Sequence, residues 1–321
     1  MSLSLGKRRA LQQCAQDDGT FAMLAMDQRG SLARMIDPDA PDQVSFQQVI
    51  AIKRDVIAAL SPLASAVLLD VEYGYGPCVA SGALSGRAGL LLAIEKSGYE
   101  GDPTARRTSL LDGWDVERTR LAGASGVKLL IYYRPDAPNA AEQEALVAEV
   151  AAACDRWELP LFLEPLHYSL DPAVKVVPNA ERRRVVIETA RRLVPLGVDV
   201  LKAEFPLDVK QSNDQAEWAD ACAELSDACP VPWVLLSAGV DFPTYAEQVK
   251  VACASGASGV LCGRAIWKEA VQLPPAQRVQ FLQTTARERF RQLSQLVSEA
   301  ARPYTHFYPA SDGADLENWY R

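Results

Sequence analysis

The stretch VDVLKAEFP, residues 198–206, is apolar and β-branched except for three charged residues. Its central part is one of eight short apolar runs that recur along the 321-residue chain. Near-continuous hydrophobicity is typical of parallel strands that are buried on both faces of a sheet. The runs are FAMLAMD (21–27), SAVLLD (65–70), AGLLLAIE (88–95), GVKLLIYY (126–133), LPLFLEP (159–165), DVLKAEF (199–205), VPWVLLS (231–237) and SGVLCG (258–263).

Amphipathic helical patterns fill most of the gaps between these runs. Apolar residues recur at three- and four-residue spacing in 43–60, 113–123, 139–157, 179–195, 212–228 and 242–255, and a longer helix is expected at 275–301. Eight strand–helix alternations predict an α/β fold, a (β/α)8 TIM barrel, with a doubly wound open sheet as the alternative.

No linker or low-complexity segment divides the chain, so residues 1–321 are expected to form a single domain. A polar and aromatic tail at 302–321 would follow the C-terminal helix. We expect it to pack on the barrel or on a neighbouring subunit, which leaves a homo-oligomer open.

Composition excludes several classes of function. The net charge of −8 without a basic face argues against nucleic acid or an anionic membrane as a partner. No apolar run is long enough to span a membrane, and no signal-peptide pattern occurs. Seven scattered cysteines without a C-x-x-C spacing indicate reduced thiols of a cytoplasmic protein. The two histidines, His167 and His306, are too few for a multi-histidine zinc site, so no metal is expected.

Ionisable residues lie near the carboxyl ends of several runs. Side chains alternate along a strand, so Lys202 and Glu204 would share with Val200 the face that points into the barrel. The same alternation turns further residues inward: Ala25, Asp27, Asp70, Glu72, Lys128, Leu130, Tyr132, Phe162 and Glu164. TIM barrels carry their chemistry at the carboxyl ends of the strands, and a convergent set of buried charges is typical of a catalytic site.

A buried lysine suggests a specific chemistry. A desolvated lysine beside another cation has a lowered pKa, and its amine can attack a carbonyl carbon to form an imine. Lys202 is the candidate nucleophile, and Lys128 is the candidate second cation. A protonated imine withdraws electrons and permits cleavage of a carbon–carbon bond, so we expect neither a metal nor another cofactor.

The last two runs end in small residues that precede a helix. LLSAGVDF (235–242) and LCGRAIW (261–267) would let backbone N–H groups approach an anion at the start of each helix. Phosphate binding by the loops after strands 7 and 8 is frequent in this fold. Together with Arg264, these segments predict a phosphate site.

Seven segments, in order, carry a family resemblance. They are LAMDQRGSLARMI, LLDVEYGYG, AGLLLAIEKSGY, GVKLLIYY, VDVLKAEFP, LSAGV and GVLCGRAIW. Over residues 20–270 the chain resembles the tagatose 1,6-bisphosphate aldolase family. The resemblance implies a class I, Schiff-base aldolase on a (β/α)8 barrel. Its substrate would be a sugar phosphate, a ketohexose 1,6-bisphosphate cleaved to dihydroxyacetone phosphate and glyceraldehyde 3-phosphate.

The resemblance also implies residue roles. Lys202 matches the imine lysine and Glu164 the acid/base carboxylate, while Asp27 and Lys128 match supporting polar residues. The residues that match the phosphate-binding strand ends are Ser237, Gly239, Gly263 and Arg264. Gln28 and Arg29 would face the other end of the substrate.

Three departures keep alternatives open. The loops after Glu164 and Glu204 are shorter than the family pattern, and the tail is unfamiliar. Sulfofructose 1-phosphate aldolase, a close relative, shares features with FLEPLHY and SAGVD, so the group at C6 is either phosphate or sulfonate. A barrel without turnover that senses a metabolite is a further alternative. A metal-dependent aldolase is disfavoured by the two histidines.

Overall fold

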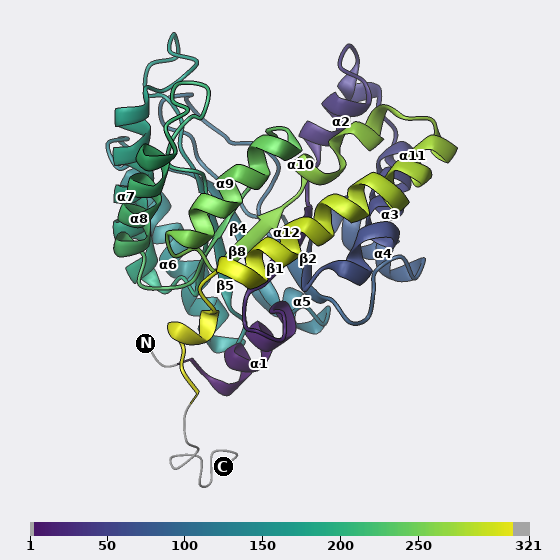
Figure 1. Cartoon of the computed structure of the whole chain (residues 1–321), viewed down its shortest axis with the longest axis horizontal. Coiled ribbons are helices and arrows are strands. Elements are labelled where there is room, and N and C mark those ends of the chain that lie inside the picture. The colour runs from purple at the N-terminus through teal and green to yellow at the C-terminus, as the bar shows by residue number, and fades with distance from the viewer. Residues whose placement is uncertain (1–2, 311–321) are drawn as a thin grey trace, which may run out of the picture.

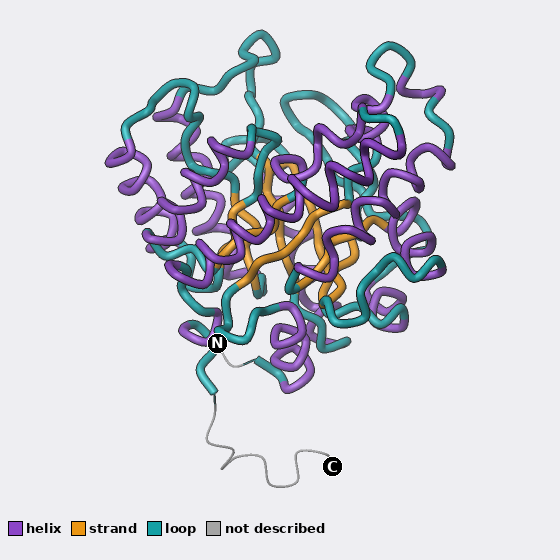
Figure 2. Tube along the Cα trace, turned by 45° about the vertical axis from the view of Figure 1, so that its right-hand side comes forward, coloured by secondary structure: helices purple, strands orange, loops and turns teal. Residues whose placement is uncertain are grey.

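A computed structural model describes residues 3–310 of the chain. Eight parallel strands close into a barrel in the order of the sequence, and helices surround them (Figures 1 and 2). The strands are β1 (Phe21–Met26), β2 (Ala66–Asp70), β3 (Gly89–Ala93), β4 (Gly126–Tyr132), β5 (Leu161–Leu166), β6 (Val200–Ala203), β7 (Trp233–Leu235) and β8 (Gly259–Cys262). Each predicted run contains one strand, so the TIM-barrel prediction is confirmed and the open sheet is wrong.

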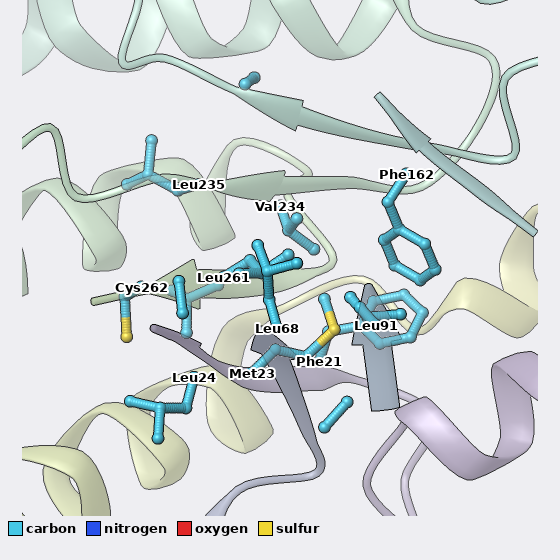
Figure 3. Close-up of a cluster of buried hydrophobic side chains, with 14 of the residues drawn as sticks. Phe21, Met23, Leu24, Leu68, Leu91, Phe162, Val234, Leu235, Leu261 and Cys262 are labelled. Carbon is cyan, nitrogen blue, oxygen red and sulfur yellow. The ribbon is translucent and has the colours of Figure 1, made fainter. Parts of the chain in front are cut away.

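The barrel interior is filled by large apolar side chains (Figure 3). Phe21 of β1 and Phe162 of β5 meet across it in an edge-to-face arrangement, with ring centroids 6.5 Å apart. This packing requires a glycine on the neighbouring strand, because a Cβ at Gly126 would lie 2.8 Å from the Phe162 ring and 2.7 Å from Leu91. This apolar floor fills the middle of the barrel.

Helices cover the outside of the barrel. They are α1 (Leu5–Cys14), α2 (Gly30–Ile36), α3 (Phe46–Leu60), α4 (Gly76–Ala80), α5 (Val116–Leu121), α6 (Ala140–Arg156), α7 (Asn179–Leu193), α8 (Gln215–Ala228), α9 (Phe242–Ala254), α10 (Arg264–Trp267), α11 (Pro275–Phe281) and α12 (Arg287–Ala300). Side-chain caps begin several of them: Ser45 and Gln48 form a capping box at α3, and Asp241 accepts the Thr244 N–H at α9. None of the described helices is long and apolar enough to cross a bilayer.

The predicted helical ranges agree with α3 and α5–α9, and the chain is helical from Pro275 to Ala300 through a π-turn at Leu282–Ala286. Helices α1, α2 and α4 were not predicted.

Helix α1 and the start of the tail close the amino end of the barrel. The Lys7 ammonium lies 2.7 Å from Asp199, just before β6, and 2.5 Å from Asp155. The Tyr308 hydroxyl donates to the main-chain oxygen of Asp199 at 2.9 Å, and Tyr304 stacks on Phe21. The tail therefore packs on the barrel as far as it is described, and its residues 311–321 lie outside the described part of the chain.

Candidate active site

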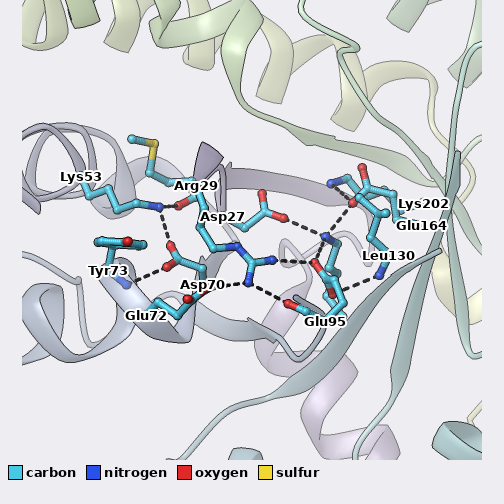
Figure 4. Close-up of polar contacts among 12 residues, drawn as sticks. Asp27, Arg29, Lys53, Asp70, Glu72, Tyr73, Glu95, Leu130, Glu164 and Lys202 are labelled. Carbon is cyan, nitrogen blue, oxygen red and sulfur yellow. Dashed lines mark hydrogen bonds and ion pairs between the residues drawn. The ribbon is translucent and has the colours of Figure 1, made fainter. Parts of the chain in front are cut away.

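An ammonium group surrounded by carboxylates lies at the carboxyl end of the barrel (Figure 4). Lys128 Nζ, from β4, donates to Asp27 Oδ2 at 2.8 Å and to Glu95 Oε1 at 2.7 Å. It also lies 3.0 Å from Glu164 Oε2 of β5. Three carboxylates from separate segments thus surround one fully buried cation, and together they hold the Lys128 side chain in place.

Lys202 lies beside this cluster but is much less constrained. Its Nζ atom, on β6, is 2.9 Å from Glu164 Oε2 and makes no other ion pair within residues 3–310. Glu164 Oε2 therefore lies between the two ammonium groups, and neither contact has the angles of a hydrogen bond. Of the two lysines, Lys202 has the fewer ion-pair partners in the described chain, one carboxylate against three for Lys128.

Burial and charge have opposite effects on this cluster. Burial by itself would raise the pKa of Asp27, but the Lys128 and Lys202 ammonium groups outweigh it and lower the pKa. Burial would lower the pKa of Lys128, but its three carboxylates raise it well above the ordinary value. Burial raises the pKa of Glu95, and Lys128 and Arg29 offset only part of the effect. Lys128 is therefore a permanent cation at neutral pH.

Glu95 is a site residue that the sequence reasoning missed. It follows β3, donates no proton to its neighbours, and accepts from Lys128, from Arg29 and from the main-chain N–H of Leu130 at 3.1 Å. The signal was present in AGLLLAIE, because alternation from Leu91 through Ala93 turns Glu95 inward.

Two residues that were expected inside the barrel point elsewhere. Strand β6 ends at Ala203, so the alternation does not extend to Glu204, which accepts from His167 and lies near Arg182 of α7. Asp70 is fully buried, but Lys53 of α3 pairs with it. The expectation that Glu204 and Asp70 converge with Lys202 is wrong, because each has a partner outside the cluster.

Arg29 reaches into the site and is held by its neighbours. Its guanidinium donates to Glu72 Oε2 at 2.9 Å, to the main-chain oxygen of Glu95 at 2.7 Å and to Glu95 Oε1 at 3.3 Å. These bonds leave little of its fork for an anion. Arg29 instead anchors Glu95, which in turn binds Lys128.

The ends of β7 and β8 come together as predicted for a phosphate site. The Gly263 N–H faces Ser237 Oγ at 3.4 Å. Gly239 has a φ of +83°, and a Cβ on it would lie 3.3 Å from Arg264 Cζ, so its lack of a side chain keeps the approach to the guanidinium open. Asp241 caps α9, and no ion pair joins it to Arg264 in the described chain.

A second cationic group, the guanidinium of Arg34, lies near the turn that follows Gln28. Gln28 itself lies beside Gly263, with its Nε2 atom 3.4 Å from the position of a Cβ on that glycine, and its buried Oε1 has no hydrogen-bond partner. A Cβ on Gly30 would lie 3.6 Å from Ser97 Oγ and 3.7 Å from Arg34 Nη1. Between residues 3 and 310, no carboxylate pairs with the Arg34 guanidinium.

One cavity of about 870 Å³ is lined by many of these groups, whereas Lys202, Ser237, Gly239 and Gly263 are not part of its lining. Its lining includes Asp27, Gln28, Arg29, Arg34, Glu95, Ser97, Lys128, Leu130, Tyr132, Glu164 and Arg264. Leu130 and Tyr132 face it as the alternation along β4 predicted. The cavity presents the carboxylates of Asp27 and Glu164 near Lys202. Arg264 and Arg34 each add a guanidinium at another position of the lining.

Comparison with known proteins identifies the family of the chain. The family model of the DeoC/LacD family aldolases matches residues 21–269. The chain belongs to this aldolase family. It is therefore a carbon–carbon lyase, and the family resemblance seen in the sequence is confirmed.

The aldolase is similar over its length to curated relatives. Tagatose 1,6-diphosphate aldolase of Lactococcus lactis is 34% identical and covers 95% of this chain and 99% of its own. Tagatose 1,6-diphosphate aldolase 1 of Enterococcus faecalis is 35% identical, and the match covers 93% of this chain and 97% of the relative.

Solved structures of other aldolases share the fold. A Schiff-base-forming fructose-1,6-bisphosphate aldolase is 20% identical with a TM-score of 0.59, covering 91% of this chain and 99% of its own. Fructose-bisphosphate aldolase from Plasmodium falciparum is 14% identical with a TM-score of 0.70, and the match covers 94% of this chain and 98% of the other. At these identities the likeness shows the fold alone.

Proposed function

We propose that this aldolase is a class I enzyme that cleaves a ketohexose 1,6-bisphosphate of the tagatose type. The observation that carries the proposal is the pair formed by Lys202 and Glu164, 2.9 Å apart in a buried site, beside a second lysine that three carboxylates hold in place. The curated relatives named for tagatose 1,6-diphosphate support the choice of substrate.

The reaction begins with Lys202. Its amine adds to the C2 carbonyl carbon, and the carbonyl oxygen leaves as water, so that a protonated imine joins Lys202 to C2. The C4 hydroxyl then gives its proton to Glu164, and the C3–C4 electron pair moves toward the imine nitrogen. Glyceraldehyde 3-phosphate leaves, C3 of the resulting enamine takes the proton back, and water hydrolyses the imine to release dihydroxyacetone phosphate.

The surrounding charges assist these proton transfers. Glu164 is within reach of Lys202, which is the geometry that general acid–base catalysis requires. The Lys128 cation lies 3.0 Å from Glu164 Oε2, and Asp27 and Glu95 keep Lys128 in position. These steps need no cofactor.

Two anion sites would orient the substrate. Ser237, Gly239, Gly263 and Arg264 would bind the phosphate of the dihydroxyacetone half. Gln28 lies beside that site and offers its amide to the same half. At the other end, Arg34 and Ser97 offer a guanidinium and a hydroxyl to the C6 anion, whereas Arg29 acts through Glu95.

A cytoplasmic location is part of the proposal. All seven cysteines are buried free thiols, which is typical of a reducing compartment.

Borohydride trapping tests the proposal directly. Borohydride added together with dihydroxyacetone phosphate should inactivate the enzyme and attach the reduced adduct to the peptide that contains Lys202. Lys202→Met should abolish both the adduct and cleavage of tagatose 1,6-bisphosphate. Lys250→Met, which removes only an exposed ion pair with Glu247, should leave both unchanged.

Other outcomes would reject parts of the proposal. An adduct on Lys128 would overturn the assignment of the nucleophile. Loss of activity in a chelator, with no adduct at all, would favour a metal-dependent aldolase, and a purified protein that binds the sugar without cleaving it would be a sensor. Faster cleavage of sulfofructose 1-phosphate than of the bisphosphate would move the C6 group from phosphate to sulfonate.

A further inference from the structure

The hydrogen-bonded ladder between β5 and β6 stops just before the reactive groups. Its paired residues are Phe162 with Val200 and Leu163 with Leu201. The next residue is Glu164 on β5 and Lys202 on β6. On the other side of β5, pairing with β4 continues to Leu166. The backbone ladder alone therefore does not set the separation of Glu164 and Lys202.

Beyond the end of this ladder, a side chain from one strand binds the other. Glu204 follows β6, and its Oε2 atom accepts from the main-chain N–H of His167 at 2.9 Å. The same oxygen lies 2.7 Å from His167 Nδ1. Because His167 follows β5, these two contacts tie the carboxyl ends of the two strands together.

Arg182 of α7 binds both segments from outside the barrel. Its Nε and Nη2 atoms donate to the main-chain oxygen of Phe205 at 3.1 and 3.0 Å. Its Nη1 atom lies 3.5 Å from His167 Nε2, and its Nη2 atom lies 3.7 Å from Glu204 Oε1. Arg182 therefore contacts the segment after β5 and the segment after β6 at once.

These three side chains are protected from solvent. The exposed fractions of His167, Glu204 and Arg182 are 12%, 10% and 16%. Burial would raise the pKa of Glu204, but His167 and Arg182 outweigh it and lower the pKa, so the carboxylate stays ionised. A buried ionised acceptor with two N–H donors on one oxygen makes a strong, well-oriented contact.

We propose that His167, Arg182 and Glu204 form a clamp that holds the carboxyl ends of β5 and β6 together and so brings Glu164 within reach of Lys202. They are positioning residues, because no hydrogen bond or ion pair joins any of the three to Glu164 or Lys202 in the described chain. The inference rests on the proposed function, which assigns proton transfer to Glu164 and the imine to Lys202.

The clamp matters because proton transfer depends on distance. A general base must be within hydrogen-bond reach of the proton that it moves. A misplacement of about 1 Å costs up to about 100-fold in rate. Loss of the clamp should therefore lower kcat more than it raises KM, since the phosphate-binding residues lie on other strands.

Glu204→Ala tests the clamp, with Glu204→Gln as the conservative variant. Glu204→Ala should lower kcat for tagatose 1,6-bisphosphate by about 10- to 100-fold with KM within about threefold. Glu204→Gln should recover most of the rate, since its amide oxygen can accept both bonds from His167. The matched control is Glu224→Ala, which removes a contact between α8 and Arg183 of α7 far from the two strand ends and should keep the wild-type kcat.

Crystal structures provide a second readout that does not depend on activity. The Lys202 Nζ to Glu164 Oε2 distance should exceed the wild-type 2.9 Å by about 1 Å in Glu204→Ala and stay unchanged in Glu224→Ala. If Glu204→Ala does not fold, His167→Ala carries the same test, because it removes the Nδ1 contact and keeps the main-chain bond.

The outcomes separate the clamp from the function on which it rests. A wild-type kcat in Glu204→Ala, or an unchanged distance, would overturn the clamp. If the wild-type enzyme itself gives no Lys202 adduct and no cleavage, the proposed function fails, and the distance comparison still decides the clamp.

Discussion

At the scale of single residues, two lysines of the same barrel have different surroundings. Lys128 is bound by Asp27, Glu95 and Glu164, which makes its deprotonation unfavourable and fixes its position. Lys202 has one carboxylate contact, and that carboxylate is shared with Lys128. The difference supports the proposed roles, in which Lys128 gives electrostatic support and Lys202 is the nucleophile.

Three arginines should affect the substrate in different ways. Arg264→Ala should lower kcat/KM by about one to two orders of magnitude for fructose 1-phosphate and fructose 1,6-bisphosphate alike, since a hydrogen bond to a charged group is worth about 1.5–3 kcal/mol. Arg34→Ala should affect only the bisphosphate. Arg29→Ala should affect both substrates equally, because it acts through Glu95.

Steady-state kinetics of Arg264→Ala, Arg34→Ala and Arg29→Ala on fructose 1-phosphate and fructose 1,6-bisphosphate measures these changes in kcat/KM. Arg87→Ala, an exposed arginine near the amino end of the barrel, is the control and should match the wild type. An equal loss on both substrates in Arg34→Ala would show that Arg34 does not contact the C6 anion. A loss confined to the bisphosphate in Arg29→Ala would move that role to Arg29.

At the scale of elements, a buried ion pair joins α3 to the strand ends that carry the site. Lys53 of α3 pairs with Asp70 at the end of β2, and both side chains are fully buried. The same ammonium donates to the main-chain oxygen of Met26 at 2.8 Å, one residue before Asp27. The pair therefore fixes the helix against β1 and β2 at once.

Removing one partner of this pair should be costly. Lys53→Met should lower the free energy of unfolding by about 3–5 kcal/mol, because it leaves the Asp70 carboxylate buried without its countercharge. The double variant Lys53→Met/Asp70→Leu should recover part of the loss. Urea denaturation measures both, with Lys250→Met as the exposed control at no more than about 1 kcal/mol. A loss in Lys53→Met as small as in the control would contradict this role of the pair.

At the scale of the whole molecule, the barrel gathers charges from five strand ends at one pole and closes the other with α1 and the tail. Asp27, Glu95, Lys128, Glu164 and Lys202 all lie at the carboxyl pole. Because the pKa values of Asp27, Glu95 and Lys128 are shifted in the folded chain, the stability of the entire fold depends on pH.

Asp27 should make a measurable part of that dependence. Its folded pKa lies below its unfolded value, so the unfolded chain binds more protons at acidic pH, and the contribution is full above about pH 4 and lost as the pH falls further. Glu95 has the opposite sign, since its raised folded pKa favours folding below its unfolded pKa and this contribution is lost as the pH rises through the folded pKa.

Urea unfolding of the wild type and of Asp27→Asn between about pH 5 and about pH 2.5 measures the difference. The free energy of unfolding of the wild type should fall more steeply with acid than that of Asp27→Asn. Equal slopes would show that Asp27 is not the group responsible.

Much of this protein could be predicted from patterns that are local in the sequence. Apolar runs and helical periodicity encode which segments are buried, and eight alternations suffice for a barrel. Period-two alternation turned Asp27, Lys128, Glu164 and Lys202 inward, and the structure brings these four together. It worked because each residue lies on a strand or directly after one.

The partners of these residues were decided only by the tertiary structure. Glu204 follows the end of β6, so alternation no longer sets its direction, and His167 binds it. Asp70 meets a lysine of a packed helix, and Arg29 meets Glu95, 66 residues away. Local sequence determines burial and direction, whereas barrel closure and the docking of each helix determine which charges come within a few ångströms of one another. Those distances distinguish Lys128, which has three carboxylate partners in the described chain, from Lys202, which has one.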